Sequence, residues 1–268
     1  MFALLVACGE NTIGNGDVDA NGGGDVDANG GQIDANFIDA MPPPENAAVY
    51  AHTSSSLYLV DPNTLEVTLI GDFGWPNGSD SMTDIAIDQF GRMIGVSFNS
   101  VYEVDEETGN CIYLAPLQGA GFNGLSFIES PAGGLEVLVG ADLSGNIYEL
   151  DPATGATTLV GNYGGGYVSS GDIVSVRGAG TFATVTDNVG TDQLAFIDPA
   201  DNYAATIIGD TGYDNIWGLG YWRNKVYGFS SDNQFLTIDV GTGEATPEQA
   251  GAFSWWGAGV TTLAPIIE

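Results

Sequence analysis

Two aspartates come closest to a chemical site in this chain of 268 residues. Asp84 begins the apolar run "DIAID" and Asp172 begins "DIVSV", and each run is an expected inner strand of a repeated unit. Carboxylate oxygens suit Ca²⁺, so the two side chains are candidate ligands for a shared calcium ion or water. The alternative is that each caps nearby backbone N–H groups. Capping is favoured, because two carboxylates are a weak calcium signal.

Residues for nucleophilic or zinc chemistry are scarce. The chain has one histidine, His52, and two cysteines, so it offers no Ser-His-Asp set and no zinc site. We therefore nominate no catalytic residue. With 35 acidic residues, a carboxylate-based hydrolase or lyase stays open as an alternative.

Aromatic residues recur in the loops expected to join one repeated unit to the next. They are Trp75, Phe122, Tyr163, Tyr167, Tyr213, Trp217, Phe253, Trp255 and Trp256. Exposed rings beside carboxylates suit sugar recognition, by stacking and hydrogen bonding. Large aromatic side chains also fill gaps between packed sheets, and burial is their usual state. The sequence thus predicts that these aromatic residues either form a ligand-binding surface or fill space between the sheets.

One segment recurs five times and indicates the architecture that positions these residues. The copies are "LYLVDPNTLEVTLIG" (57–71), "VYEVDEETGNCIYLA" (101–115), "IYELDPATGATTLVG" (147–161), "LAFIDPADNYAATIIG" (194–209) and "FLTIDVGTGEATPEQ" (235–249). Their shared aspartates, Asp61, Asp105, Asp151, Asp198 and Asp239, are 41 to 47 residues apart. Such a period, with several short strands per unit, is typical of β-propeller blades.

Four strands are expected in each unit, and both faces of the third strand are largely apolar. Sheets covered on both sides suit blades packed between neighbours, whereas a two-layer sandwich leaves one face polar. Four units are complete. The fifth combines three strands from residues 47–71 with an inner strand from 256–264, which closes the ring. We expect an all-β fold: a five-bladed propeller with four-stranded blades over residues 47–268.

The "DPxTG" turns are explained without function. Asp bonds the backbone two residues on, Pro presets φ and Gly takes the left-handed position. The repeat resembles the "LYxVDPxTGxxTxIG" pattern of bacterial quinoprotein-like and glutamine-cyclotransferase-like propellers, over about 222 residues. This resemblance implies the fold rather than an activity. It keeps a cyclotransferase-like enzyme, dependent on carboxylates or calcium, as the second hypothesis.

The N-terminal region repeats "GDVDANGG" at 16–23 and 24–31. As an EF-hand loop it places Asp17, Asp19, Asn21 and Gly22 correctly, but the position of the bidentate Glu is Ala28. The stretch also resembles the Asp-rich calcium repeats of thrombospondin type 3 modules, so weak calcium binding stays open. Residues 9–46 lack apolar periodicity and basic residues, which favours a disordered acidic tether.

The run "LLVAC", ending at Cys8, resembles the lipobox of bacterial lipoproteins. The resemblance implies that residues 1–8 are the remnant of a signal, that Cys8 carries lipid and that Cys111 is unpaired. The protein is then expected outside the cytoplasm, anchored by lipid to the outer membrane or cell surface. Residues 1–7 lack a basic segment, so the true signal is expected to begin further upstream.

The charge balance narrows the class of partner. Four basic residues against 35 acidic ones give a net charge of −31, which excludes a basic surface for nucleic acid. We therefore expect a monomeric, non-catalytic binding module for a carbohydrate or an envelope protein. Calcium is the only cofactor under consideration, and the lipid anchor is the only expected contact with a membrane.

Overall fold

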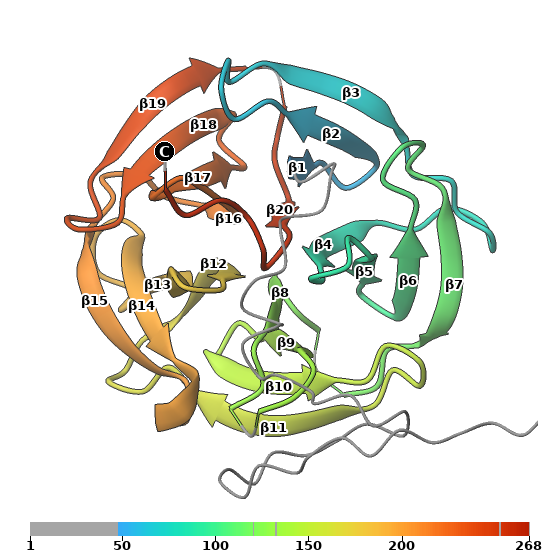
Figure 1. The fold of residues 1–268 in the computed structure, drawn as a ribbon, viewed down its shortest axis with the longest axis horizontal. Coiled ribbons are helices and arrows are strands. Elements are labelled where there is room, and N and C mark those ends of the chain that lie inside the picture. The colour runs from blue at the N-terminus through green and yellow to red at the C-terminus, as the bar shows by residue number, and fades with distance from the viewer. Residues whose placement is uncertain (1–47, 120, 132, 252, 268) are drawn as a thin grey trace, which may run out of the picture. The chain divides into compact units, whose positions relative to one another are not determined.

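The computed structural model describes residues 48–267 apart from 120, 132 and 252. Five antiparallel sheets of four strands stand around a common axis, as Figure 1 shows. This confirms the predicted five-bladed β-propeller. The predicted tether and Cys8 lie outside the described residues.

The blades are numbered from the one that contains both chain ends. Blade 1 is β20 (Gly257–Val260), β1 (Val49–His52), β2 (Ser56–Val60) and β3 (Val67–Asp72). Blade 2 is β4 (Met82–Ile87), β5 (Met93–Ser97), β6 (Ser100–Val104) and β7 (Cys111–Pro116). Blade 3 is β8 (Gly124–Ile128), β9 (Val137–Ala141), β10 (Asn146–Leu150) and β11 (Thr157–Asn162). Blade 4 is β12 (Val168–Val176), β13 (Gly180–Thr186), β14 (Gln193–Asp198) and β15 (Ala204–Asp210), with a short 3₁₀ turn, η1 (Pro199–Asp201). Blade 5 is β16 (Ile216–Trp222), β17 (Lys225–Ser230), β18 (Gln234–Asp239) and β19 (Ala245–Ala250).

Blade 1 closes the ring in the predicted way. Strand β1 pairs on one side with β2 and on the other with β20, so Tyr50 lies opposite both Leu59 and Gly259. The C-terminal strand is the inner strand of this blade, beside the inner strands β16 and β4. Backbone hydrogen bonds therefore join the two ends of the propeller in one sheet.

The repeated turns have the structural role predicted from their residues. The Asp61 carboxylate accepts from the Asn63 amide at 2.8 Å, and the other four aspartates make the equivalent bond. These N–H donors lower the pKa of Asp61 below its ordinary value. The glycine position is left-handed, at φ 70° in Gly155. Leu65 takes that conformation in the first copy, at φ 61°.

The inner strands crowd together around the axis. Each inner strand carries a mostly small residue at the corresponding position, and these five residues are all buried: Ala86, Ser126, Val174, Gly220 and Gly259. A Cβ on Gly218 would lie 2.6 Å from the carbonyl carbon of Gly257 in the next inner strand. Glycine is needed at this position because two backbones meet without space for a side chain.

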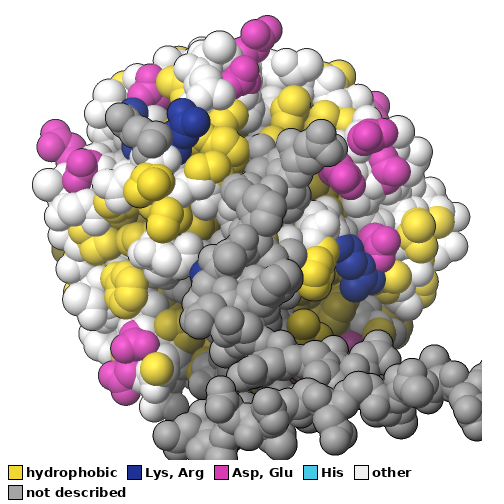
Figure 2. All heavy atoms as spheres, viewed as in Figure 1, with side chains coloured by type: hydrophobic (Ala, Val, Ile, Leu, Met, Phe, Trp, Pro, Cys, Tyr) yellow, Lys and Arg dark blue, Asp and Glu magenta, His cyan; other side chains and the backbone are white. Residues whose placement is uncertain are grey.

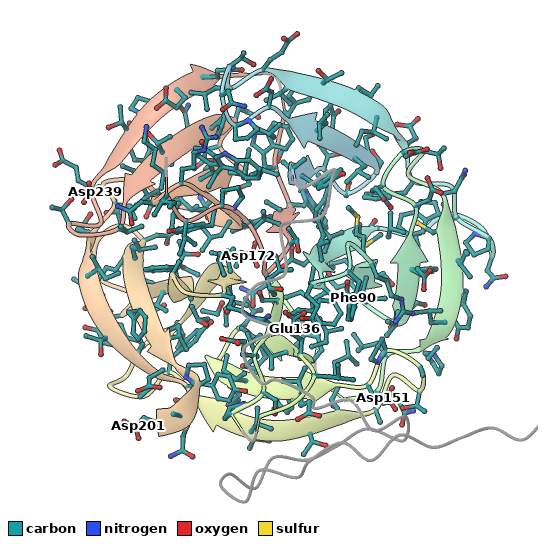
Figure 3. All side chains as sticks on the ribbon, viewed as in Figure 1. Phe90, Glu136, Asp151, Asp172, Asp201 and Asp239 are labelled. Carbon is teal, nitrogen blue, oxygen red and sulfur yellow. The ribbon has the colours of Figure 1, made fainter. Side chains whose placement is uncertain are left out.

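The chain direction defines two ends of the ring. The loop face is the end where the inner strands begin. It carries the loops between blades and those between second and third strands. The turn face is the other end, with the turns between first and second strands and the Asp-containing hairpins between third and fourth. Figure 3 places Asp172 near the centre of the ring, and Asp151, Asp201 and Asp239 at the rim.

Neighbouring blades also pack closely at the rim. There, a glycine near the end of several outer strands lies against the hairpin of the next blade. A Cβ on Gly161 in β11 would contact the Asn202 carbonyl oxygen and lie 2.6 Å from a ring carbon of Tyr203, both in the hairpin of blade 4. Gly71 and Gly209 meet carbonyl oxygens of the next hairpin in the same way. The glycine in the repeated pattern therefore permits contact between blades.

We predict that Gly161→Ala lowers the free energy of unfolding by about 1–3 kcal/mol, because the methyl group overpacks this contact. Chemical denaturation monitored by tryptophan fluorescence measures the change. Gly121→Ala is the matched control, because a Cβ there meets nothing within 4 Å and φ is not left-handed. Equal stability of the two variants would contradict the proposed close approach.

Candidate functional site

Asp84 and Asp172 project from inner strands of blades 2 and 4, and both side chains are completely buried. Asp84 lies in β4, while Asp172 lies within an irregular part of β12, where the pairing register shifts between Ser169 and Ile173. The two carboxyl groups lie close enough to alter each other's pKa. The fold therefore brings together the pair that the sequence singled out.

Asp172 ties three inner strands together. One carboxylate oxygen accepts the Ile173 amide at 2.6 Å and the Leu125 amide of β8 at 3.3 Å. The other accepts the Leu219 amide of β16 at 2.6 Å. Asp84 accepts the Ile85 amide at 2.9 Å. Backbone capping, the alternative favoured from sequence, is observed, and for Asp172 it extends to neighbouring blades.

The pKa shifts of the two carboxyl groups indicate that the pair holds one proton at neutral pH. Burial, followed by repulsion from Asp172, raises the pKa of Asp84 well above its ordinary value. Burial also raises the pKa of Asp172, to about 7, against the opposing effect of its hydrogen bonds. The second oxygen of Asp84 has no donor among the described residues, which suits the oxygen that carries the proton. Protonated Asp84 then donates to Asp172, whose charge the N–H groups stabilise.

His52, at the end of β1, is fully buried beside this pair. Its Nε2 lies 3.7 Å from an Asp84 oxygen, while Nδ1 lies 2.9 Å from the Thr53 carbonyl oxygen. Because that carbonyl can only accept, the proton is on Nδ1. Burial lowers the pKa of His52 to about 4, so the ring is neutral at pH 7. A Cβ on Gly257 would strike both Asp84 and His52, so backbone covers the cluster closely.

These residues fit calcium poorly. Three carboxylate oxygens are occupied by N–H donors, which leaves one oxygen of Asp84, whereas calcium takes six to eight oxygen ligands. No group of three metal-binding side chains occurs in the described part of the chain. The geometry favours a shared proton, and the predicted calcium site stays a prediction.

Three of the predicted aromatic residues are buried. Phe122, Tyr163 and Trp255 expose 4%, 1% and 2% of their surface. Trp75, Tyr167 and Tyr213 are half-buried, and Trp75 packs on Phe73 and Tyr102. The fully buried members fill space between blades, which was the alternative stated from the sequence.

A row of aromatic rings remains accessible on the loop face. Trp217 is 36% exposed, and its ring centroid lies 6.1 Å from that of half-buried Trp256. Phe98, 60% exposed, lies 6.3 Å beyond Trp256. These three residues, the aromatic row, come from blades 5, 1 and 2. The structure brings together Trp217 and Trp256, both predicted from the sequence.

Phe98 was missed by the sequence analysis. It follows β5, in the loop between the second and third strands of blade 2. Such loops share a face with the loops between blades, so an aromatic residue in "SFNS" was an available signal. Only the packing, however, shows that it meets Trp256.

The basic residues all lie at the turn face. Arg92, Arg177 and Arg223 occupy turns between first and second strands, and Lys225 begins β17. Arg92 pairs with Glu103 at 2.7 Å, and Arg177 pairs with Glu129 at 2.9 Å. Figure 2 shows blue basic side chains on this face, over the region of β17 and near β5. Near the axis at this end, the Glu136 carboxylate accepts a hydrogen bond from the backbone N–H of Gln89 at 2.9 Å.

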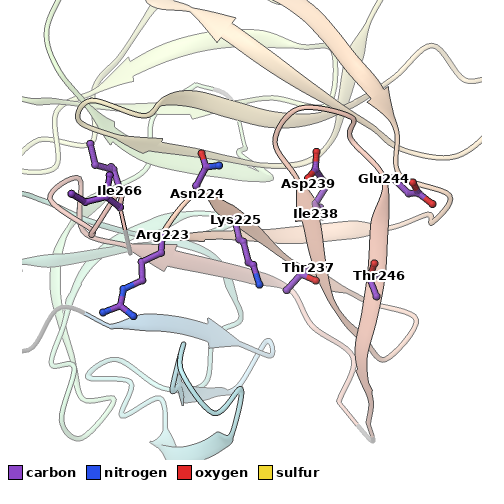
Figure 4. A pocket seen from close by; sticks show the side chains of 10 residues that line it. Arg223, Asn224, Lys225, Thr237, Ile238, Asp239, Glu244, Thr246 and Ile266 are labelled. Atoms are coloured by element: carbon purple, nitrogen blue, oxygen red, sulfur yellow. The ribbon is translucent and has the colours of Figure 1, made fainter.

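A shallow groove of about 670 Å³ also lies at the turn face, on blade 5. Arg223 and Lys225 line it with Asp239, Glu244 and Ile266, as Figure 4 shows. Asp239 is held by its own turn, through bonds from Gly241 and Thr242. The groove thus combines both signs of charge and offers no set of groups aimed at one ligand.

No protein-family model matches the chain, and no curated protein matches it. Solved structures similar in fold include a chain of a nidogen/laminin complex, with a TM-score of 0.51 and 10% identity over 82% of this chain and 100% of the other. A protein of unknown function from Bacteroides caccae has a TM-score of 0.41 and 9% identity over 75% and 71%. The Dos1 propeller has a TM-score of 0.41 and 13% identity over 75% and 55%. These likenesses concern the fold alone.

No described helix is long and apolar enough to cross a membrane. Cys111 is a buried thiol whose pKa burial raises to about 12, so it is unreactive at pH 7.

We predict that Asp84→Asn removes a pH-dependent loss of stability. With its pKa raised, Asp84 keeps a proton in the folded chain that the unfolded chain releases above about pH 4. The contribution of Asp84 to the free energy of unfolding is therefore greatest below pH 4 and declines as pH rises. In the variant, the Asn side chain can donate an N–H to Asp172 at every pH. The stability advantage of the variant over the wild type should therefore grow steadily between about pH 5 and about pH 8.

Denaturant unfolding at both pH values measures this change. Asp201→Asn, which removes an exposed carboxylate at the rim, is the control and should show no such trend. If the advantage of Asp84→Asn were the same at both pH values, Asp84 would not carry the shared proton.

Proposed function

We propose that this protein is a non-catalytic binding module that takes its ligand on the loop face, at the aromatic row. The single observation that carries the proposal is the exposure of Trp217 and Phe98 on either side of Trp256. Large rings held at a surface give contact area with little loss of conformational freedom, which makes them effective binding residues.

The ring architecture supports this function. The three residues come from blades 5, 1 and 2, whose inner strands β16, β20 and β4 pack side by side. Gly218 of β16 lies against Gly257 of β20, and Gly259 of β20 lies against Ile85 of β4. Rings mounted on such a rigid support lose little freedom when a ligand binds. The ligand is a carbohydrate or a protein, and the fold suits partners of both kinds.

The enzyme hypothesis receives less support. His52, Asp84 and Asp172 lie close together, but all three are 0% exposed, so a substrate has no contact with them in this conformation. Both Asp172 oxygens are also occupied by backbone N–H donors from three inner strands. We therefore nominate no catalytic residue.

The location proposed for the module is the cell surface. We propose that Cys8 carries the lipid and that residues 9–46 form the tether, with calcium binding as a further property of its Asp-rich repeats. Mass spectrometry of the protein purified from its own membrane fraction tests the anchor, because a diacylglyceryl group adds a defined mass to the N-terminal cysteine. An unmodified Cys8 would overturn it.

We predict that the double variant Trp217→Ala, Trp256→Ala loses binding to whatever ligand the wild type retains from a neutral glycan array and a peptide array. Each lost ring contact should weaken affinity about tenfold. Phe90→Ala, which removes an exposed ring on the turn face, is the control and should bind normally. Binding by wild type and double variant alike would place the site elsewhere, and no binding to either array would reject the proposal.

A further inference from the structure

We infer that the ligand of the aromatic row is a cationic polypeptide segment, bound through arginine side chains that lie on the rings. This inference rests on the proposed function and specifies its partner. It follows from the absence of basic residues among the described residues of the loop face and from the surroundings of Trp217.

The described loops of the loop face contain carboxylates and no Lys or Arg. Their acidic residues are Asp80, Asp142, Asp187, Asp192, Asp214 and Asp232. All four basic residues of the chain lie at the opposite end of the blades. The potential over the aromatic row is therefore negative without local compensation, and it attracts a positively charged partner.

Two of these aspartates are close to the row. Asp214 precedes Trp217 by three residues and is exposed. Asp232, also exposed, accepts a hydrogen bond at 3.0 Å from the Asn215 side chain, which holds it beside the same loop. No described cation neutralises either carboxylate. Both are available for the forked hydrogen bonds that a guanidinium donates.

The rings provide the other half of an arginine site. Trp217 and Phe98 each meet Trp256 at a steep angle, 85° and 79° between ring planes. The row therefore presents flat ring surfaces in different orientations. Among aromatic side chains, the indole of Trp binds a cation best. A guanidinium is planar, so it can stack on a ring while its N–H groups reach a carboxylate, whereas an ammonium lacks this geometry.

Other partners fit less well. Anionic glycans, nucleic acids and anionic lipid surfaces would be repelled by a chain of net charge −31, and the loop face has no cation to offset this. A neutral glycan would stack on the rings and donate hydroxyl hydrogen bonds to the carboxylates, but it carries no charge for the negative potential to attract. A cationic polypeptide uses both features.

Fluorescence titration of the full chain with a synthetic peptide of alternating Arg and Ser tests the inference, because Trp217 and Trp256 report directly on contact. We expect binding that weakens strongly as ionic strength rises from about 0.01 M to about 1 M, where the Debye length falls from about 30 Å to about 3 Å. The same peptide with Lys should bind more weakly, and with Gln it should not bind.

Two variants locate the site. Trp217→Ala should weaken binding about tenfold through loss of stacking. The double variant Asp214→Asn, Asp232→Asn should also weaken it, whereas Glu107→Gln with Asp201→Asn removes the same amount of charge at the rim and should have little effect. Because all four aspartate and glutamate side chains are exposed, these variants are expected to fold.

The outcomes separate this inference from the proposed function. If the rim variant weakens binding as much as the loop-face variant, attraction is only a matter of net charge and the inference is wrong. If the Arg peptide does not bind but a neutral glycan binds in a Trp217-dependent way, the inference is wrong and the proposed function stands. If neither probe binds, both are rejected.

Discussion

Close approach of five inner strands around one axis is the constraint on which the rest of this structure depends. At Gly218 and Gly257 the backbones of neighbouring blades come so near that a methyl group has no room. Asp172 supplies the polar counterpart, because its carboxylate accepts amides from its own strand and from the strands on either side. Carboxyl groups so fully buried lose hydration, and the N–H donors together with the proton on Asp84 offset that loss. The features that first resembled a metal site are thus explained by the assembly of the ring.

Closure of the ring depends on a second interaction, the pairing of β20 with β1. Without it, blade 1 would present an unpaired strand edge and the inner ring would have a gap beside β4 and β16. The same seam places Trp256, one residue before β20, next to the loop after β5 and the start of β16. The candidate binding surface is therefore a product of closure, since its three rings come from blades that are separated in the sequence.

The four basic residues all lie at one end of the blades, which makes the two faces chemically different. Two of the four basic residues at the turn face, Arg92 and Arg177, form ion pairs with neighbouring acids. The loop face has carboxylates and accessible rings. A polyanionic protein of this kind is kept soluble by self-repulsion and at the same time concentrates cations near the aromatic row. The deep polar cluster of His52, Asp84 and Asp172 stabilises the support for that surface and does not itself touch solvent.

The sequence alone determined the fold, because the repeat carries its own structural chemistry: alternating apolar residues for doubly covered strands, and Asp, Pro and Gly for the turns. It also determined the seam, since residues at the two ends completed one missing blade. Spacing further indicated that Asp84 and Asp172 occupy equivalent inner strands. It did not indicate the shared proton, which requires full burial and the amides of Leu125 and Leu219 from other blades.

Only the tertiary structure decided which aromatic residues are accessible. Phe122, Tyr163 and Trp255 were expected in the same kind of loop as Trp217, yet they are buried, while Trp217, at the start of β16, and Phe98 are exposed. Exposure depends on how much space neighbouring blades leave, and that space is fixed by packing between segments far apart in the chain. The types and order of residues specify the strands and turns, whereas the accessible surface emerges only when the ring closes.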